Sequence, residues 1–433
     1  NTQFLILDDY RFKNKWIKNF KKKNKKIKLI VFDDNHLKNT KADYIINASK
    51  DCLDENFATR GIKLYGPKYS IINPKLKRAK EKSSKFEILL YFGGGFNYKT
   101  YHKEIREILI NLKNLNNRIR INCIVGPLSK NFKKIKRNLK SSNIKFYENI
   151  YDLKEILMRS DFYIGSASSI LYELNYLRIP SIIFTLNTKQ KNIKKNFFEK
   201  LGNYFILELK DLKHPNIFDL LRCLLKNVKK IKKNINTREI CIKKNGTKNI
   251  VDLLTNVKPT VDELNINKKK LKNKSYFQKA KLADINEFLE IRNYKKNRTV
   301  SANIRKISRV DHYIWWLKEP IEKFKFTDKN FTKIIFWRKK IFFKNFFYYT
   351  GGWSTSNYKV NLNEIIYGYK KMLETKKNLK WLGITKKSNK FLTWLNLKIG
   401  FSIVKQENLS IQIKQFLKII KIKNYKKFNI FSI

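Results

Sequence analysis

Short apolar runs alternate with longer amphipathic stretches over about the first 255 residues. The runs are nearly continuous, as in buried parallel strands. We therefore expect strands at 4–8, 28–32, 43–47, 87–92, 120–125, 143–147, 161–165 and 180–185. Stretches with a helical period predict helices at 101–114, 131–141, 152–159, 169–178 and 215–230. This alternation indicates α/β structure with parallel sheets covered on both faces.

Breaks in the pattern divide the chain. A Gly-Pro turn and charged residues at 66–82 interrupt the rhythm, so two sheets are expected. Residues 256–274 are rich in Lys and Asn, which indicates a linker. Residues 275–433 hold six of the seven Trp and open on a helical pattern at 284–292. Strand-like runs there are 333–337, 341–349 and 380–384. The predicted domains are 1–74, 75–255 and, after the linker, a mixed α+β domain at 275–433.

Composition narrows the class of protein. Hydrophobic residues make up 42% of the chain, which is ample for packed cores and excludes a mostly disordered protein. No apolar stretch is long enough to predict a transmembrane helix, and no signal peptide is recognisable. The four Cys are far apart, so neither a disulfide framework nor a metal site is expected, and we expect a cytoplasmic protein.

The net charge of +61 suggests attraction to nucleic acid or anionic lipid. However, 80 of the 96 basic residues are Lys, and Asn, Ile and Phe are also abundant, as A/T-rich codons favour. The lysines are spread between apolar residues, which is more typical of a solvated face than of a binding stripe. We therefore expect no nucleic-acid partner.

A loop of small residues follows the strand expected at 161–165, which ends at Gly165. It consists of Ser166, Ala167, Ser168 and Ser169. Small residues let the backbone approach a ligand, and free N–H groups at a helix start suit a diphosphate. Glu173, one turn into the helix, is placed to accept hydrogen bonds from two ribose hydroxyls. Alternatively, a serine caps the helix and Glu173 is exposed, and the two interpretations stay open.

Two other turns contain glycine. Gly93, Gly94 and Gly95 follow the strand expected at 87–92 and would give a phosphate or a sugar close access to the backbone. Taken alone this is a weak signal, because many turns from strand to helix contain glycine. Gly126-Pro127 is interpreted only as a turn.

These segments resemble a known family, the UDP-2,4-diacetamido-2,4,6-trideoxy-β-L-altropyranose hydrolases of pseudaminic acid biosynthesis. That family is related to the MurG-type glycosyltransferases and has the two-lobed GT-B fold. The resemblance is carried by E-N-I-x-D-L, S-D-F-x-I-G-S-A-S-S, Y-E-L and I-P-S-I within residues 148–182. Other matching segments are Leu7 to Tyr10 with Trp16, Asp33-Asp34, Ala42 to Asn47, Gly66 to Tyr69, Phe92 to Gly94, and Lys244 to Gly246.

The resemblance implies two Rossmann-like lobes, the first of them incomplete. It implies hydrolysis of the C1–O bond of a UDP-sugar, without a cofactor, and it places Tyr10 near the reacting sugar. The residues implied to hold UDP and substrate are Gly93, Gly94, Gly165, Ser166, Ser168, Ser169, Glu173 and Gln190.

The sequence departs from this family in three ways. The G-x-G-H-x-x-R loop, whose histidine assists the attacking water, has no counterpart in residues 1–433. Because the sequence starts at Asn1 and enters a strand almost at once, we expect a chain cut within a domain and inactive as it stands. The usual G-A-G-G-S loop has fewer glycines here, and Asn73 replaces a common arginine. The last two departures suggest a divergent substrate or a weakened site.

Residues 278–405 resemble the GNAT acetyltransferases that act on amino-sugar nucleotides. The matching segments are Ala283-Asp284, Ile291 to Asn293, Ile307-Ser308, His312 with Trp315, Trp381 to Ile384, and Gly400-Phe401. The resemblance implies acetyl-CoA as a cofactor and His312 as a base. The pyrophosphate loop Q/R-x-x-G-x-G/A is absent, and the helix start at 360–363 has no glycine. A histidine beside two tryptophans is more often a packed core residue, and both interpretations of His312 stay open.

The favoured hypothesis is a nucleotide-sugar enzyme of nonulosonic acid biosynthesis, whose first part hydrolyses a UDP-linked diacetamido-trideoxy sugar. One alternative is N-acetyl transfer to a UDP-amino sugar by the GNAT-like part. Another is a basic protein that binds nucleic acid or an anionic polymer, for which the aromatic run from Phe336 to Tyr349 is the best candidate. Release of CoA thiol would support the former alternative, and steep salt dependence the latter.

Overall fold

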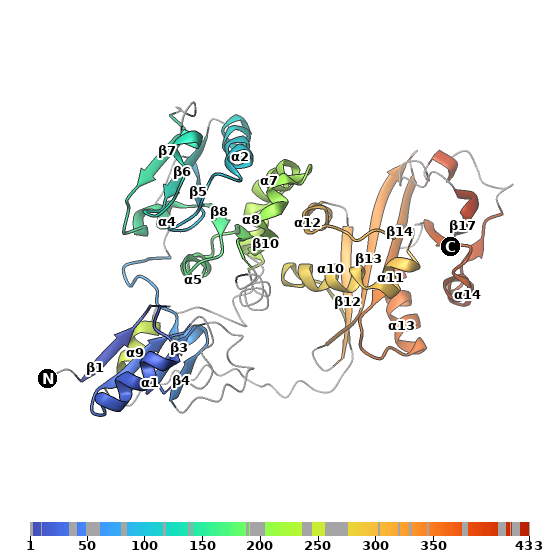
Figure 1. Ribbon diagram of the computed structural model, residues 1–433. Coiled ribbons are helices and arrows are strands. Elements are labelled where there is room, and N and C mark those ends of the chain that lie inside the picture. Colours follow the sequence, from blue (N-terminus) through green and yellow to red (C-terminus); the bar gives the residue numbers. More distant parts are fainter. Residues whose placement is uncertain are drawn as a thin grey trace. The chain divides into compact units, whose positions relative to one another are not determined.

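The structure, a computed structural model, describes residues 3–9, 11–33, 41–48, 61–78, 85–115, 118–136, 139, 142–187, 190, 204–235, 245–255, 276–301, 304–318, 321–328, 331–343, 346–374, 380–405, 413–415, 417 and 425–432. The chain divides into two compact units, Asn1–Ile266 and Asn267–Ile433. The first unit is α/β with two parallel sheets and the second is α+β (Figure 1), which confirms the predicted fold class. The predicted linker at 256–274 lies outside the described residues.

The first sheet is parallel and has the order β1-β2-β3-β4. Its strands are β1 (Phe4–Leu7), β2 (Lys28–Phe32), β3 (Tyr44–Asn47) and β4 (Ile62–Tyr65). Strand β4 is not among the predicted strands, because only Leu64 within it is fully buried and the apolar signal is weak. Helix α1 (Asn14–Lys23) buries Ile17 against this sheet. Helix α9 (Gly246–Leu254) ends the described part of the unit and packs Ile250 against the same sheet.

The second sheet is also parallel, with the order β10-β9-β8-β5-β6-β7. Its strands are β5 (Phe86–Tyr91), β6 (Ile119–Val125), β7 (Ile144–Glu148), β8 (Phe162–Ser166), β9 (Ser181–Thr185) and β10 (Tyr204–Glu208). The chain runs outward from β5 to β6 and β7, then returns to place β8, β9 and β10 on the other side. This doubly wound order has its topological switch point between β5 and β8. Strand β10 is not among the strands predicted from the sequence.

The helices around this sheet are α2 (His102–Leu115), α3 (Lys133–Lys136), α4 (Lys154–Arg159), α5 (Ile170–Tyr176), α7 (Ile217–Lys226) and α8 (Val228–Lys233), with the 3-10 turn η3 (Leu209–Lys213). The 3-10 turn η2 (Pro67–Tyr69) follows β4 and packs Tyr69 into the core of the first sheet. The single helix expected at 215–230 is wrong. It is divided at Asn227, whose side chain donates to the Cys223 carbonyl at 2.8 Å and ends α7. Helix α3 covers only part of the helix expected at 131–141, whose far end lies partly outside the described residues.

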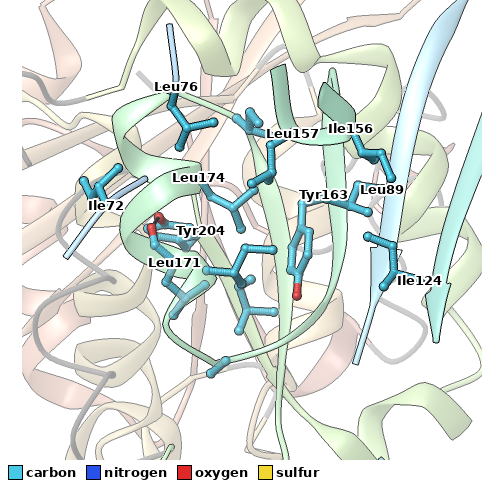
Figure 2. Close-up of a cluster of buried hydrophobic side chains, with 14 of the residues drawn as sticks. Ile72, Leu76, Leu89, Ile124, Ile156, Leu157, Tyr163, Leu171, Leu174 and Tyr204 are labelled. Carbon is cyan, nitrogen blue, oxygen red and sulfur yellow. Dashed lines mark hydrogen bonds between the residues drawn. The ribbon is translucent and has the colours of Figure 1, made fainter. Parts of the chain in front are cut away.

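The core beside α4 and α5 reaches across the sheet (Figure 2). Leu89 of β5 and Tyr163 of β8 face these helices. The neighbours of Leu89 in β5, Ile88 and Leu90, point the opposite way and are also fully buried, so both faces of the sheet are covered. Ile72, in the segment that connects the two sheets, joins this core. The core therefore ties that segment to the carboxyl half of the unit.

The second unit has one mixed sheet of order β11-β12-β13-β14-β15-β17-β16. Its strands are β11 (Tyr276–Lys279), β12 (Ile321–Asp328), β13 (Phe331–Phe343), β14 (Phe346–Thr355), β15 (Lys380–Lys386), β16 (Ser402–Ile403) and β17 (Phe428–Ser432). Its helices are η4 (Leu282–Asp284), α10 (Ile285–Asn293), α11 (Lys295–Thr299), α12 (Arg309–Leu317), α13 (Leu362–Leu373), α14 (Lys390–Ile399) and η6 (Tyr425–Lys427).

Two predictions for this unit are wrong. The run at 341–349 is not one strand, because it is divided between β13 and β14, which pair antiparallel with Phe343 opposite Phe346. Only the two polar residues Lys344 and Asn345 interrupt the aromatic residues on either side, so the sequence gives a weak signal of that division. The unit also opens on strand β11 rather than on a helix. In the described part of the chain, no helix is both long and apolar enough to span a bilayer.

Candidate functional site

The two loops singled out in the first unit lie at its topological switch point. The glycine loop that begins at Gly93 follows β5, and the serine loop that begins at Ala167 follows β8. Strands β5 and β8 are adjacent and parallel, with Tyr91 in register with Gly165. In doubly wound sheets, ligands bind in the crevice outside the carboxyl ends of the strands at this point. The fold therefore brings together two segments that are about seventy residues apart in the sequence.

Glycines make the close packing of these loops possible. A Cβ at Gly165 would lie 1.8 Å from the Tyr91 carbonyl oxygen. A Cβ at Gly126 would lie 2.4 Å from the Gly94 Cα. Gly93 has φ +97°, which favours glycine. At Gly94, by contrast, a Cβ would meet nothing within 4 Å. Backbone atoms therefore pack closely against Gly165 and Gly126, whereas the space beside Gly94 is open.

Gly126, which the sequence predicts only as part of a turn, has a second role in the structure. It is buried beneath the glycine loop, and Leu128 donates its N–H to the Gly94 carbonyl at 2.8 Å. Gly126 also forms part of the wall of a cavity of about 570 Å³. This cavity lies at the carboxyl ends of β6 and β7. Asn131 and Asn149 line this cavity with positive φ angles of 63° and 58°. No pattern in the sequence predicts this cavity.

The serine loop separates into a buried half and an accessible half. Ser166 is 1% exposed and lies against Gly93, so its side chain packs inside the protein. Ser168 is half-buried, while Ser169 is exposed and occupies the N-cap position of α5. The Ser169 side chain makes no capping hydrogen bond. Ser168 and Ser169 therefore remain the candidates for a ligand contact, and Ser166 positions the loop.

Glu173 faces the segment that connects the two sheets. Its carboxylate accepts a hydrogen bond from the backbone N–H of Asn73. The Asn73 side chain in turn donates to Asp152 Oδ1 at 3.2 Å. Burial raises the pKa of Glu173 and the charge of Asp152 raises it further, while the Asn73 N–H lowers it. Glu173 is thus a partly desolvated acceptor beside the candidate loop, and one of its contacts is made within the protein.

The remaining predicted site residues of the first unit are Gln190 and Tyr10. Gln190 accepts the Leu186 N–H on its Oε1 at 2.7 Å, and its own N–H donates to Asn187 Oδ1 at 2.9 Å. These contacts give Gln190 a local role at the end of β9. Tyr10 lies outside the described residues. Among the described residues, no group of His, Cys, Asp and Glu is arranged to hold a metal ion.

In the second unit, strands β14 and β15 separate after a short contact. They pair in parallel only at Tyr348 with Lys380 and Tyr349 with Trp381. Beyond that point β15 pairs with β17. At the end of β14 that β15 does not pair with, the side chain of Asn297 in α11 binds the backbone of Thr355. It donates to the Thr355 carbonyl at 2.8 Å and accepts the Thr355 N–H at 3.3 Å.

The start of α13 is where the resemblance places the coenzyme pyrophosphate. Asn361 and Glu364 form a capping box, with each side chain accepting the other's backbone N–H, at 2.8 and 2.9 Å. Glu364 Oε1 also accepts a bond from Lys333 at 2.6 Å. The protein's own side chains thus already accept two backbone N–H groups at this helix start, and one of the acceptors is a carboxylate, which would repel a pyrophosphate. The residues present are therefore a poor fit to acetyl-CoA at this helix start.

His312 is packed inside the second unit. It is 3% exposed, its Nε2 lies 2.8 Å from the Ile285 carbonyl, and its ring stacks on Trp315 at 5.5 Å. Burial, together with the positive charges of Arg309 and Lys323, lowers the pKa of His312 to about 4, although the hydrogen bond to the Ile285 carbonyl opposes this shift. A neutral, buried ring bonded to a backbone carbonyl is a packing residue. The geometry favours that interpretation over a role as base.

The comparisons with known proteins match parts of the chain. No protein-family model matches. An uncharacterized protein of Methanocaldococcus jannaschii is 29% identical over 227 residues, which is 48% of this chain and 45% of that protein. The matched part is therefore less than half the length of that relative.

Solved structures with some likeness fall into two groups. A crystal structure of Acinetobacter baumannii MurG covers 56% of this chain and 70% of its own, at 15% identity and a TM-score of 0.37. A GNAT-family acetyltransferase of Streptococcus pneumoniae covers 37% and 98%, at 10% identity and a TM-score of 0.29. The Salmonella typhimurium acetyltransferase yncA, solved with acetyl-CoA, covers 37% and 92%, at 11% identity and a TM-score of 0.27. The strand orders by themselves define an α/β first unit and an α+β second unit.

Proposed function

We propose that the first unit binds a UDP-linked sugar at the switch point between β5 and β8. The observation that carries this proposal is the glycine packing there. Backbone atoms pack closely against Gly165 and Gly126, whereas the space beside Gly94 is open. Such a loop exposes backbone N–H groups to a diphosphate while keeping bulky side chains away. Ser168 and Ser169 follow the adjacent strand β8, and in this proposal Glu173 supplies a carboxylate acceptor for ribose hydroxyls.

The proposed reaction is hydrolysis of a UDP-diacetamido-trideoxy sugar in the cytoplasm, as a step of nonulosonic acid biosynthesis. The oxygen of a water molecule forms a bond to C1 of the sugar, and the C1–O bond to the diphosphate breaks. UDP leaves with the electron pair, and the water's proton passes to a base. The histidine that the resemblance implies as this base is not among the residues of this sequence. The residues of this sequence therefore support the UDP-binding step of the proposed reaction.

Titration calorimetry with UDP, with ADP as the comparison nucleotide, tests the binding step. Gly94→Leu places a side chain above the loop, where its Cβ meets no protein atom within 4 Å, so it should lower UDP affinity at least tenfold while the fold is kept. Leu128→Ala is the matched control, because it truncates a side chain that is 75% exposed on the neighbouring loop. Equal UDP affinities for both variants would show that the site lies elsewhere.

A second variant tests the ribose contact. Glu173→Ala should weaken UDP binding, and unchanged affinity would remove Glu173 from the site. Chromatographic detection of UDP released from a UDP-diacetamido sugar tests the chemistry. Turnover would support hydrolysis and would show that another group in this sequence serves as the base.

A further inference from the structure

The outer face of α14 in the second unit is apolar although it is exposed. Phe391, Trp394 and Leu397 are 48%, 45% and 48% exposed. Residues three apart on a helix lie on neighbouring positions of its surface, so these three form one stripe. The Phe391 and Trp394 rings are in contact, with centroids 6.1 Å apart. Ile403, on the edge strand β16 that packs beside α14, is 45% exposed.

This stripe is not a by-product of a loosely defined helix. Asn389 caps the start of α14 by accepting the Leu392 N–H at 3.0 Å, and Gly400 ends the helix with φ +110°. The inner face is fully used, since Leu395 is 0% exposed and Asn396 accepts a bond from the Tyr369 hydroxyl at 3.1 Å. The helix is therefore fixed in rotation with its aromatic residues directed away from the core.

The charged residues of α14 and of the sequence on either side of it have one sign. Residues 380–405 contain six Lys and no Asp or Glu. Four of these lysines, all exposed, belong to α14 and the segments on either side of it: Lys387, Lys390, Lys398 and Lys405. An apolar stripe with a Trp and a rim of Lys matches an anionic lipid surface, where rings and aliphatic groups enter the interface and ammonium groups meet phosphates. A second copy of this chain would bring a charge of the same sign, which opposes association.

We propose that α14 docks the second unit onto an anionic lipid surface. The α14 docking face consists of Phe391, Trp394 and Leu397 with the lysine rim. Attachment through one short helix is reversible, and it weakens as salt screens the lysines. The proposal is independent of nucleotide binding by the first unit.

Co-sedimentation with vesicles tests the proposal on the full chain. We expect binding to phosphatidylcholine vesicles that contain phosphatidylglycerol, and at least tenfold weaker binding to phosphatidylcholine alone. The double variant Phe391→Ser/Trp394→Ser should lose at least tenfold in partition onto the anionic vesicles. Both side chains are exposed, so the fold should persist, which circular dichroism melting checks.

The matched control is Phe331→Ser/Tyr358→Ser. These two rings lie in the same unit, are 51% and 49% exposed, and also contact each other, with centroids 4.7 Å apart. Equal loss in both double variants would mean that binding is not specific to α14 and would overturn the proposal. So would an absence of binding to anionic vesicles. A dimer in solution that dissociates only in the α14 variant would overturn it as well, because the face would then belong to a second copy.

Discussion

Two helix starts, one in each unit, follow a strand in the same way and are used differently. Helix α5 begins after Ser169, whose side chain makes no capping bond, beside glycines that hold the backbone in close packing. Helix α13 begins with a complete capping box between Asn361 and Glu364, tied to Lys333. The former helix start has no side-chain cap, which fits the ligand site proposed there, whereas the backbone N–H groups of the latter are bound by the protein itself. Under this proposal, related connections serve binding in one unit and stability in the other.

The largest effect is expected from adding a side chain at Gly165, where β8 packs closely against β5. Gly165→Ala places a methyl group 1.8 Å from the Tyr91 carbonyl, so strands β5 and β8 must move apart. We expect the unfolding free energy of the first unit to fall by about 3 kcal/mol. Gly94→Ala, which meets nothing within 4 Å, is the control and should change it by less than about 0.5 kcal/mol. Urea unfolding measures both, and equal midpoints would refute the close packing described for Gly165.

The buried histidine makes the second unit sensitive to acid. Burial lowers the pKa of His312 to about 4 in the folded state, while the unfolded chain takes up a proton near pH 6.5. Stability is therefore full above pH 6.5 and is lost as the pH falls toward 4. We expect a loss of about 2 kcal/mol in unfolding free energy between pH 7 and pH 5. Denaturant unfolding at both pH values tests this.

The control for that prediction is His312→Asn. It is expected to be less stable at pH 7, because it loses the stacking on Trp315, but its stability should no longer carry this pH dependence. If wild type and variant show the same slope against pH, His312 titrates near its ordinary pKa, and the interpretation as a base becomes open again.

A smaller effect is expected at Glu173. If its carboxylate holds the ribose, UDP should bind about tenfold more tightly than 2′-deoxy-UDP, and Glu173→Gln should reduce that ratio. Burial raises the pKa of Glu173, so the preference should fade with acid at a pH above the ordinary titration range of a glutamate. Calorimetric titration with both nucleotides gives the ratio. A ratio near one at all pH values would leave Glu173 with only its contact to Asn73.

Sequence patterns predict the fold well where one signal dominates. Buried parallel strands such as β5 and β9 are continuous runs of apolar residues, and most of these strands are predicted to within a residue or two. Strand β4 has a single fully buried residue, Leu64, and carries no such signal. The division between β13 and β14 is missed for the opposite reason, because strong apolar signals on both sides outweigh the short polar break at Lys344 and Asn345.

The site is predictable only in part, because its geometry depends on distant segments. The glycine and serine loops can each be located in the sequence, but their meeting at Tyr91 and Gly165 follows from the strand order. The role of Gly126 depends on a contact with Gly94, which no local pattern encodes. The occupation of the α13 start by Glu364 likewise depends on Lys333, which lies in a different element.

The smallest effect is expected at the start of α13, the capped helix start of the second unit. Glu364→Gln keeps a side-chain acceptor for the capping box but removes the charge that pairs with Lys333, which then retains Asp328 at 3.2 Å. We expect a loss of about 0.5–1 kcal/mol in the stability of the second unit, measured by urea unfolding. Calorimetry should show no acetyl-CoA binding by the wild type. Removing one carboxylate also removes repulsion toward a pyrophosphate, so weak binding by Glu364→Gln alone would identify Glu364 as the obstacle. Binding by the wild type would contradict the contrast between the two helix starts, because α13 would then accept a ligand despite its capping box.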